Sequence, residues 1–165
     1  MRESQVAKIL IVYDSETGNT RIMAKAVAQG TQKAGKVEVF VKKAEETSNS
    51  DLLEVDGIIM GSPTYFGQMS AKLKSLIDAS ISVHGQLTGK VGGAFTSSGG
   101  TASGGETTLL SIVQAMLIHG MIIWGRADDK HYGVAVTGKP DKEDLAECEE
   151  LGKRVAELVL RLKQT

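Results

Sequence analysis

Cysteine is almost absent from this sequence, since Cys148 is the single one among 165 residues. One cysteine can form neither an intrachain disulfide nor a cysteine-cluster metal site. The histidines have no paired carboxylate spacing that suggests zinc, so we expect no metal. Cys148 falls on the apolar stripe of the last predicted helix, which favours a small core residue over a reactive thiol.

Long apolar runs and charge of one sign are lacking too. No apolar segment approaches the roughly 20 residues that a membrane span needs. The chain has 19 Lys and Arg against 20 Asp and Glu, a formal net charge of −1, which indicates no nucleic-acid partner. Met1 to Gln5 is short and polar, and the apolar run behind it ends at Asp14 without a small-residue cleavage pattern. We therefore expect a core strand rather than a signal peptide, and a cytoplasmic protein.

What the sequence does contain is a regular alternation of short apolar runs and amphipathic segments. The apolar runs predict strands at 9–13, 37–41, 56–61, 91–96 and 121–124, and 131–136 either extends the last edge or forms a hairpin with it. Helices are predicted over 19–34, after 68, over 107–118 and from Asp141 onward. This order predicts a single α/β domain, 1–165, with a five-stranded parallel sheet covered on both faces.

The first loop of this sheet is rich in hydroxyls. Gly18 allows a tight bend there, and Asn19 suits a left-handed position. The helix that follows leaves unpaired N–H groups at its N-terminus, which is a site for a phosphate. An ordinary turn capped by Thr17 or Asn19 is the alternative. The loop comprises Ser15, Glu16, Thr17, Gly18, Asn19 and Thr20.

Two further loops follow the third and fourth strands, and all three loops are expected at the carboxyl edge of the sheet, where ligands of such sheets bind. The first of these has two aromatic residues, which either pack on a ligand ring or anchor the loop against the core. The two loops comprise Pro63, Thr64, Tyr65, Phe66 and Gly67, and Thr96, Ser97, Ser98, Gly99 and Gly100.

Competing sites fail on residue type. A nucleotide P-loop needs a Lys after its last glycine, but Glu106 stands there. The dinucleotide fingerprint is missing, because Gly18 is the only glycine in the loop directly after the first strand. Nor does the run around Ser97 have the glycine that a nucleophile elbow needs before its serine. A flat heteroaromatic ligand that carries one phosphate remains.

These loops resemble those of flavodoxin-like proteins. The stretch 15–20 is similar to the phosphate loop of flavodoxins, which bind FMN on a three-layer α/β sandwich of strand order 2-1-3-4-5. The resemblance extends to the NAD(P)H:quinone oxidoreductases of the WrbA type. It is carried by Pro63-Thr64-Tyr65-Phe66-Gly67-Gln68-Met69-Ser70, by Phe95-Thr96-Ser97-Ser98-Gly99-Gly100 with Gly104-Gly105-Glu106-Thr107, and by His119-Gly120-Met121.

The resemblance implies tightly bound FMN, NAD(P)H as co-substrate and a quinone or other small acceptor. It implies that the three loops bind FMN and that His119 approaches the flavin, where it and Tyr65 are the candidate catalytic residues. His119 could equally cap the end of its helix. Two departures stand out: Tyr65 replaces an Arg that is common in that family, and the chain lacks insertions that help to build the family's tetramer. A homodimer or homotetramer is nevertheless expected.

Two functions stay open beside a flavin-free scaffold. A flavodoxin-type carrier would pass single electrons between proteins, but such carriers are strongly acidic and a charge near −1 gives little steering. Carriers also usually place an aromatic in the later loop, and none occurs between Thr96 and Glu106. Both features favour the enzyme.

Overall fold

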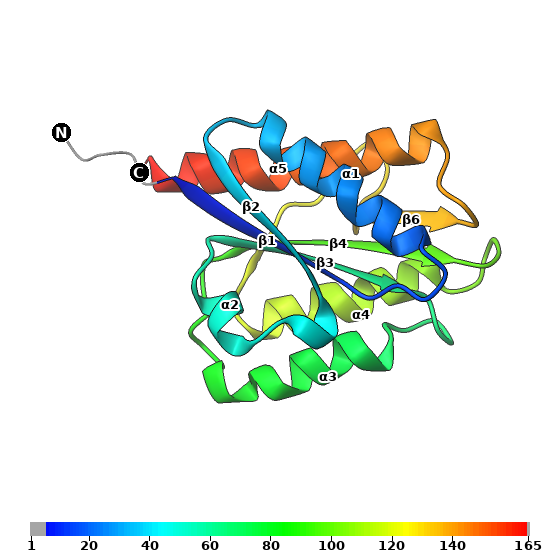
Figure 1. Cartoon of the computed structure of the whole chain (residues 1–165), viewed down its shortest axis with the longest axis horizontal. Helices are drawn as coiled ribbons and strands as arrows, with labels where there is room; N and C mark the ends of the chain where they lie inside the picture. The colour runs from blue at the N-terminus through cyan, green and yellow to red at the C-terminus, as the bar shows by residue number, and fades with distance from the viewer. Residues whose placement is uncertain (1–5, 165) are drawn as a thin grey trace.

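The computed structural model describes residues 6–164 and has a parallel sheet between two layers of helices (Figure 1). The strand order β2-β1-β3-β4-β5 is the predicted one. Met1 to Gln5, on which the expectation about a signal peptide partly rests, lies outside the described residues. The elements, in order, are β1 (Ala7–Tyr13), α1 (Asn19–Lys33), β2 (Val37–Lys43), η1 (Ala44–Glu46), α2 (Asn49–Leu53), β3 (Gly57–Pro63), α3 (Ala71–Ala79), η2 (Ser80–Val83), β4 (Val91–Ser98), α4 (Gly105–Ile118), β5 (Ile122–Ile123), β6 (Val134–Thr137) and α5 (Lys142–Lys163).

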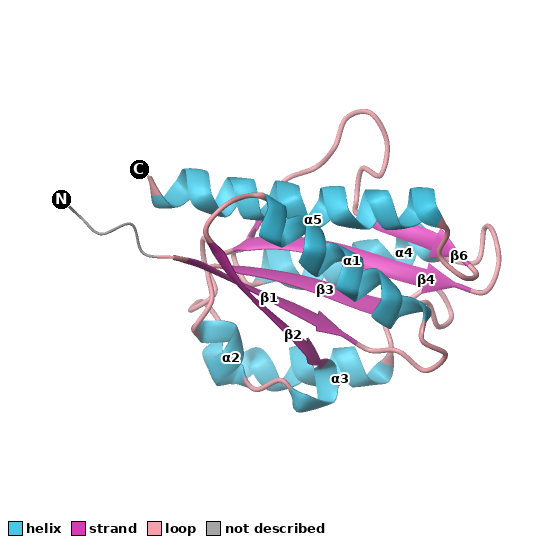
Figure 2. Ribbon diagram, turned by 45° about the horizontal axis from the view of Figure 1, so that its top comes forward, coloured by secondary structure: helices cyan, strands magenta, loops and turns pink. Residues whose placement is uncertain are grey.

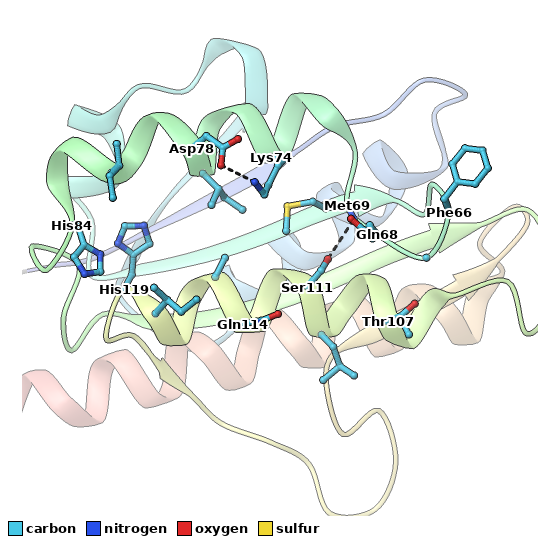
Figure 3. A pocket seen from close by; sticks show the side chains of 16 residues that line it. Phe66, Gln68, Met69, Lys74, Asp78, His84, Thr107, Ser111, Gln114 and His119 are labelled. Atoms are coloured by element: carbon cyan, nitrogen blue, oxygen red, sulfur yellow. Dashed lines mark hydrogen bonds and ion pairs between the residues drawn. The ribbon is translucent and has the colours of Figure 1, made fainter.

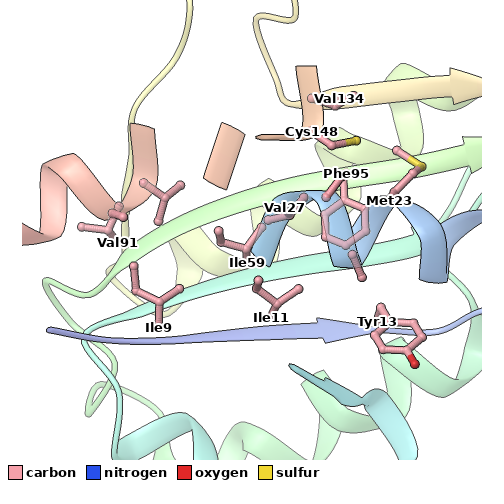
Figure 4. Packing of buried hydrophobic residues seen from close by; sticks show 14 of the residues in the cluster. Ile9, Ile11, Tyr13, Met23, Val27, Ile59, Val91, Phe95, Val134 and Cys148 are labelled. Atoms are coloured by element: carbon pink, nitrogen blue, oxygen red, sulfur yellow. The ribbon is translucent and has the colours of Figure 1, made fainter. Parts of the chain in front are cut away.

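The two helical layers follow from the alternation of side chains along the strands. Ile9 and Ile11 of β1 face one layer, and Leu10 and Val12 face the other. Helices α1 and α5 cover the first face, and α2, α3 and α4 cover the second (Figure 2). Figure 4 shows the first core, in which Phe95 packs near Cys148 of α5. Burial raises the pKa of the Cys148 thiol to about 12, which agrees with the predicted core position.

The last strand is divided in two. The segment β5 pairs with Val91 and Gly92 at the start of β4, and β6 pairs in parallel with 95–98 at its end. Segment 131–136 therefore extends the sheet and forms no hairpin with β5. Gly133 marks the return to the sheet, because it has φ +132° and a Cβ there would lie 2.1 Å from the carbonyl oxygen of Ala94.

The ends of β1 and β3 lie side by side at the carboxyl edge, where Tyr13 is in register with Gly61 and Pro63 with Ser97. The chain leaves β1 toward β2 on one side and β3 toward β4 on the other. This reversal is the place at which open α/β sheets bind their ligands. Among residues 6–164 no helix has both the length and the apolar character to cross a membrane.

Candidate functional site

The first loop opens the N-terminus of α1. Gly18 occupies the N-cap with φ +100° and has no side chain of its own to cap this helix. The Oγ of Ser15 accepts hydrogen bonds from the backbone N–H of Gly18 (3.2 Å) and of Arg21 (3.3 Å). The alternative of a cap by Thr17 or Asn19 is thus wrong, as is the left-handed position of Asn19, which is the first residue of α1. The glycine takes that position because a left-handed φ costs it nothing.

The second loop is a tight turn closed by two hydrogen bonds between Tyr65 and Gln68, both 3.0 Å from N–H to carbonyl oxygen. Phe66 and Gly67 both have positive φ, +51° and +74°, as in a type I′ turn. The Phe66 side chain is fully exposed, so the alternative of anchoring against the core does not hold for it. Tyr65 is 44% exposed. Burial, then the carboxylates of Glu16 and Asp14, raise the pKa of its hydroxyl.

Hydroxyl groups join the third loop to the other two. Thr20 and Ser97 share a buried hydrogen bond of 2.8 Å between their Oγ atoms. Thr96 Oγ1 donates to the carbonyl oxygen of Ser62 at 2.7 Å and lies 2.9 Å from Thr64 Oγ1. Because a hydroxyl has one proton, Thr64 is the donor in the second bond. The predicted hydroxyls of these four threonine and serine residues therefore bond to one another and hold the loops in place.

Backbone contact brings the second and third loops still closer. Gly104 is the N-cap of α4, with φ +91° and no side-chain cap. A Cβ on Gly104 would lie 2.5 Å from the Cα of Gly67, and a Cβ on Gly67 would lie 2.9 Å from Thr107 Oγ1. Two helices with a glycine N-cap, α1 and α4, thus begin at the edge where the three loops meet. Ser98 and Gly100 lie in the same third loop, joined by a 3.0 Å hydrogen bond from Ser98 Oγ to the Gly100 carbonyl.

His119 is the one predicted site residue that the chain does not bring to this edge. It is the C-cap of α4, about 20 Å from the N-terminus of that helix at 1.5 Å per residue. Its Nε2 lies 2.7 Å from Ser80 Oγ, and its ring centroid is 5.5 Å from that of His84. Burial, and then His84, lower the pKa of His119. The position of His119 at the end of its helix is confirmed. Within one chain His119 does not lie close to the three loops.

A groove of about 1030 Å³ runs between α3 and α4, from Phe66 at one end to His84 and His119 at the other (Figure 3). Its walls include Ile81 and Ile118, which are 74% and 65% exposed. The groove includes Phe66 and Gly67 of the second loop but no residue of the first loop. It is therefore a neighbouring feature and not the place where the three loops meet.

Lys72 of α3 is a residue that sequence reasoning did not single out for the site. The Lys72 Nζ lies 3.1 Å from Glu16 Oε1, 3.5 Å from Glu45 Oε2 and 3.9 Å from Asp14 Oδ1. The hydrogen bond that Lys72 donates to Glu16, followed by the charges of Glu16, Glu45 and Asp14, raises the pKa of Lys72. The signal that could have identified it is the pair of acids at positions 14 and 16, which needs a nearby cation.

Comparison with known proteins agrees with this architecture. The family described as NADPH-dependent FMN reductase matches residues 7–128. An NAD(P)H dehydrogenase (quinone) from Archaeoglobus fulgidus is 39% identical over 191 aligned positions, which cover 95% of this chain and 100% of that protein. A flavodoxin from Aquifex aeolicus is 38% identical over 162 positions, with 93% and 88% covered.

Among solved structures, the WrbA-like flavodoxin from Agrobacterium tumefaciens superposes with a TM-score of 0.81 at 26% identity and covers 94% of this chain and 98% of that one. The resemblance to flavodoxin-like proteins of the WrbA type, and the three-layer fold expected from it, are confirmed. The alignment of 191 positions exceeds the 165 residues of this chain, so the archaeal relative has inserted segments that this chain lacks.

Proposed function

Because this chain belongs to the NADPH-dependent FMN reductase family, we propose that it is an FMN-dependent oxidoreductase that reduces quinones with NAD(P)H. The observation that carries the proposal is the meeting, at the switch point of the sheet, of three loops and the N-termini of two helices whose N-cap residue is glycine. Its relative from Archaeoglobus fulgidus is a quinone-dependent NAD(P)H dehydrogenase. FMN is the cofactor, and NAD(P)H is the source of electrons.

The residues of the first loop fit a phosphate. The N-cap Gly18 has no side chain to cap α1, and Ser15 Oγ takes only the N–H of Arg21 in the first turn. In the described part of the chain this leaves the N–H groups of Asn19 and Thr20, together with the helix dipole, for an anion. Thr17 is exposed beside them and would supply a hydroxyl. We assign the FMN phosphate to 15–20.

The second and third loops would hold the flavin ring. Their backbone N–H groups can bond ring carbonyls and nitrogens and can stabilise negative charge on the ring when it is reduced. Tyr65, which is half-exposed next to the first loop, would pack against a ring face. When bound, FMN accepts a hydride and passes two electrons on, so the protein positions the reactants and needs no general base. No aromatic side chain occurs between Thr96 and Glu106, which leaves one side open to nicotinamide and quinone in turn.

Flavin titration and stopped-flow reduction test this proposal. The purified protein supplied with FMN should turn yellow and bind FMN far more tightly than riboflavin or FAD. NADH or NADPH should then bleach the flavin, and benzoquinone should restore its colour in a two-electron step. Binding of riboflavin as tight as that of FMN would contradict the phosphate assignment, and a protein that takes up no flavin would be a scaffold.

A flavodoxin-type electron carrier is the second candidate. The alignment with the flavodoxin from Aquifex aeolicus spans 162 positions, close to the length of this chain, whereas the quinone-dependent relative is longer. The same stopped-flow experiment separates the two functions. A carrier would not be reduced by either nicotinamide. When it is reduced by other means, it would stop at the one-electron-reduced state.

We also propose a homo-oligomer, in keeping with the resemblance. The α3–α4 groove supports it, because Ile81 of η2 and Ile118 of α4 line it and are more than half exposed, and an exposed apolar patch of this kind marks an interaction surface. The single domain 1–165 and the cytoplasmic location stay predictions.

A further inference from the structure

Lys72 joins three separate parts of the chain at the flank of the first loop. It is the second residue of α3, directly after the turn that carries Tyr65. Its Nζ donates to Glu16 Oε1 at 3.1 Å and pairs with Glu45 in η1 and with Asp14 at the end of β1. The lysine thus links α3 to the first loop, to the end of β1 and to η1.

The contact with Asp14 matters most, because Asp14 is buried. The Asp14 side chain is 8% exposed, and in the described part of the chain Lys72 is the only basic group within 4.0 Å of its carboxylate. A buried carboxylate without a partner is strongly unfavourable. Asp14 directly precedes the loop 15–20, so any movement of Asp14 toward water would displace the loop as well.

The same carboxylates would oppose a phosphate. Three acids, Asp14, Glu16 and Glu45, surround one lysine, so the cluster keeps a formal charge of −2 even with Lys72 in place. A phosphate monoester carries about −1.5 to −2 at neutral pH. Removing the lysine would raise the repulsion and would also free the loop.

We infer that Lys72 is a positioning residue for the FMN phosphate, which acts through Asp14 and Glu16 by offsetting part of their negative charge and fixing the loop that they flank. The inference rests on the proposed function. The cluster also lies near the ring side of the site, because α3 begins three residues after the turn closed by Tyr65 and Gln68 and Lys72 is its second residue. Glu16 and Asp14 raise the pKa of the Tyr65 hydroxyl in that turn. Lys72 therefore raises the reduction potential of bound FMN, because a nearby cation favours the negatively charged reduced ring.

The experiment compares Lys72→Met, Lys72→Arg and Lys74→Met as apoproteins titrated with FMN and with riboflavin. Lys74 is the matched control: it lies two residues further along α3 and pairs with Asp78 at 2.7 Å, away from the loops. We expect Lys72→Met to weaken FMN about tenfold, the effect of about 1.4 kcal/mol, and riboflavin less than threefold. Lys72→Arg and Lys74→Met should bind FMN as the wild type does.

Two more readouts separate a charge effect from a purely structural one. The midpoint potential of bound FMN should become more negative in Lys72→Met and stay unchanged in Lys74→Met. Adding Glu16→Gln to Lys72→Met should recover most of the FMN affinity. If Lys72→Met fails to fold, Glu45→Gln in the wild-type background replaces it and should tighten FMN while leaving riboflavin unchanged.

Equal loss of FMN and riboflavin affinity in Lys72→Met, or FMN binding as tight as in the wild type, would overturn the inference. So would an unchanged FMN affinity in Glu45→Gln. Failure of the proposed function looks different, because the wild-type protein would then bind neither flavin or would bind both equally.

Discussion

Single hydrogen-bonding groups and single glycines hold the three loops of the candidate site together. The Thr20–Ser97 bond joins the first loop to the third, and Thr64 and Thr96 join the second to the third. Gly67 and Gly104 meet backbone to backbone in the same region. The spacing between the loops is therefore set by these hydrogen bonds and by the close backbone contact of Gly67 and Gly104.

Replacing Gly104 with Ala tests that spacing. The new Cβ would lie 2.5 Å from the Gly67 Cα at a residue whose φ is +91°, so the two loops must separate. We expect a loss of about 1–3 kcal/mol in unfolding free energy and weaker FMN binding, measured by urea denaturation and by titration.

The control for this variant is Gly89→Ala. Gly89 has a similar φ, +81°, but nothing lies within 4 Å of its Cβ position, so only backbone strain is added. If both variants lose the same stability and neither loses FMN affinity, the contact between Gly67 and Gly104 has no special role.

Among the elements, the short helix α2 depends on its own cap. Ser48 and Asp51 form a capping box, and Asp51 also accepts a 2.8 Å hydrogen bond from Lys42 of β2. A helix of five residues has too few internal hydrogen bonds to persist without such support. The cap therefore positions α2 against the end of the sheet.

Asp51→Asn should lower the unfolding free energy by about 1 kcal/mol at pH 7. The hydrogen bond from Lys42, followed by that from the Ser48 backbone, lowers the pKa of Asp51 below 3.8 in the folded state. The folded state thus binds this proton less readily than the unfolded state, so the stabilisation is present above pH 4 and is lost as the pH falls through the folded pKa.

Denaturation curves of the wild type and Asp51→Asn at pH 7, 5 and 3 check this, and the difference should shrink at the lowest pH. Asp78→Asn provides the control, since the Lys74–Asp78 pair is exposed on α3 and should change stability by less than about 0.5 kcal/mol. A constant difference from pH 7 to pH 3 would exclude the charge of Asp51 as the cause.

At the scale of the whole molecule, the α3–α4 groove predicts self-association. Ile118→Asp places a charge on this face, where the native side chain is 65% exposed, so the fold should survive while the assembly dissociates. Sedimentation velocity should give a monomer for Ile118→Asp and a larger species for the wild type. Tyr132→Ser, in an exposed position on another surface, should assemble normally, and a monomeric wild type would contradict the proposal.

The order of the strands and the loops at their ends could be predicted from sequence, because buried strands appear as apolar runs and turns as runs of glycine and hydroxyl residues. The split of the last strand could not, because it depends on how close Gly133 comes to Ala94. The role of Lys72 could not be predicted either, because its three carboxylate partners come from parts of the chain that only the fold brings together. The distance of His119 from the loops follows from the length of α4. The sequence predicts this length, but a resemblance based on short motifs does not take it into account.

The divided last strand also protects the molecule from its neighbours. A continuous outer strand would offer a ladder of unpaired backbone groups onto which another chain could add. Here β5 has two residues and β6 has four, separated by the excursion 124–133, so no intermolecular sheet can propagate from that border. At the opposite border β2 ends in Lys43, and a charged lysine on an edge strand discourages the addition of another chain.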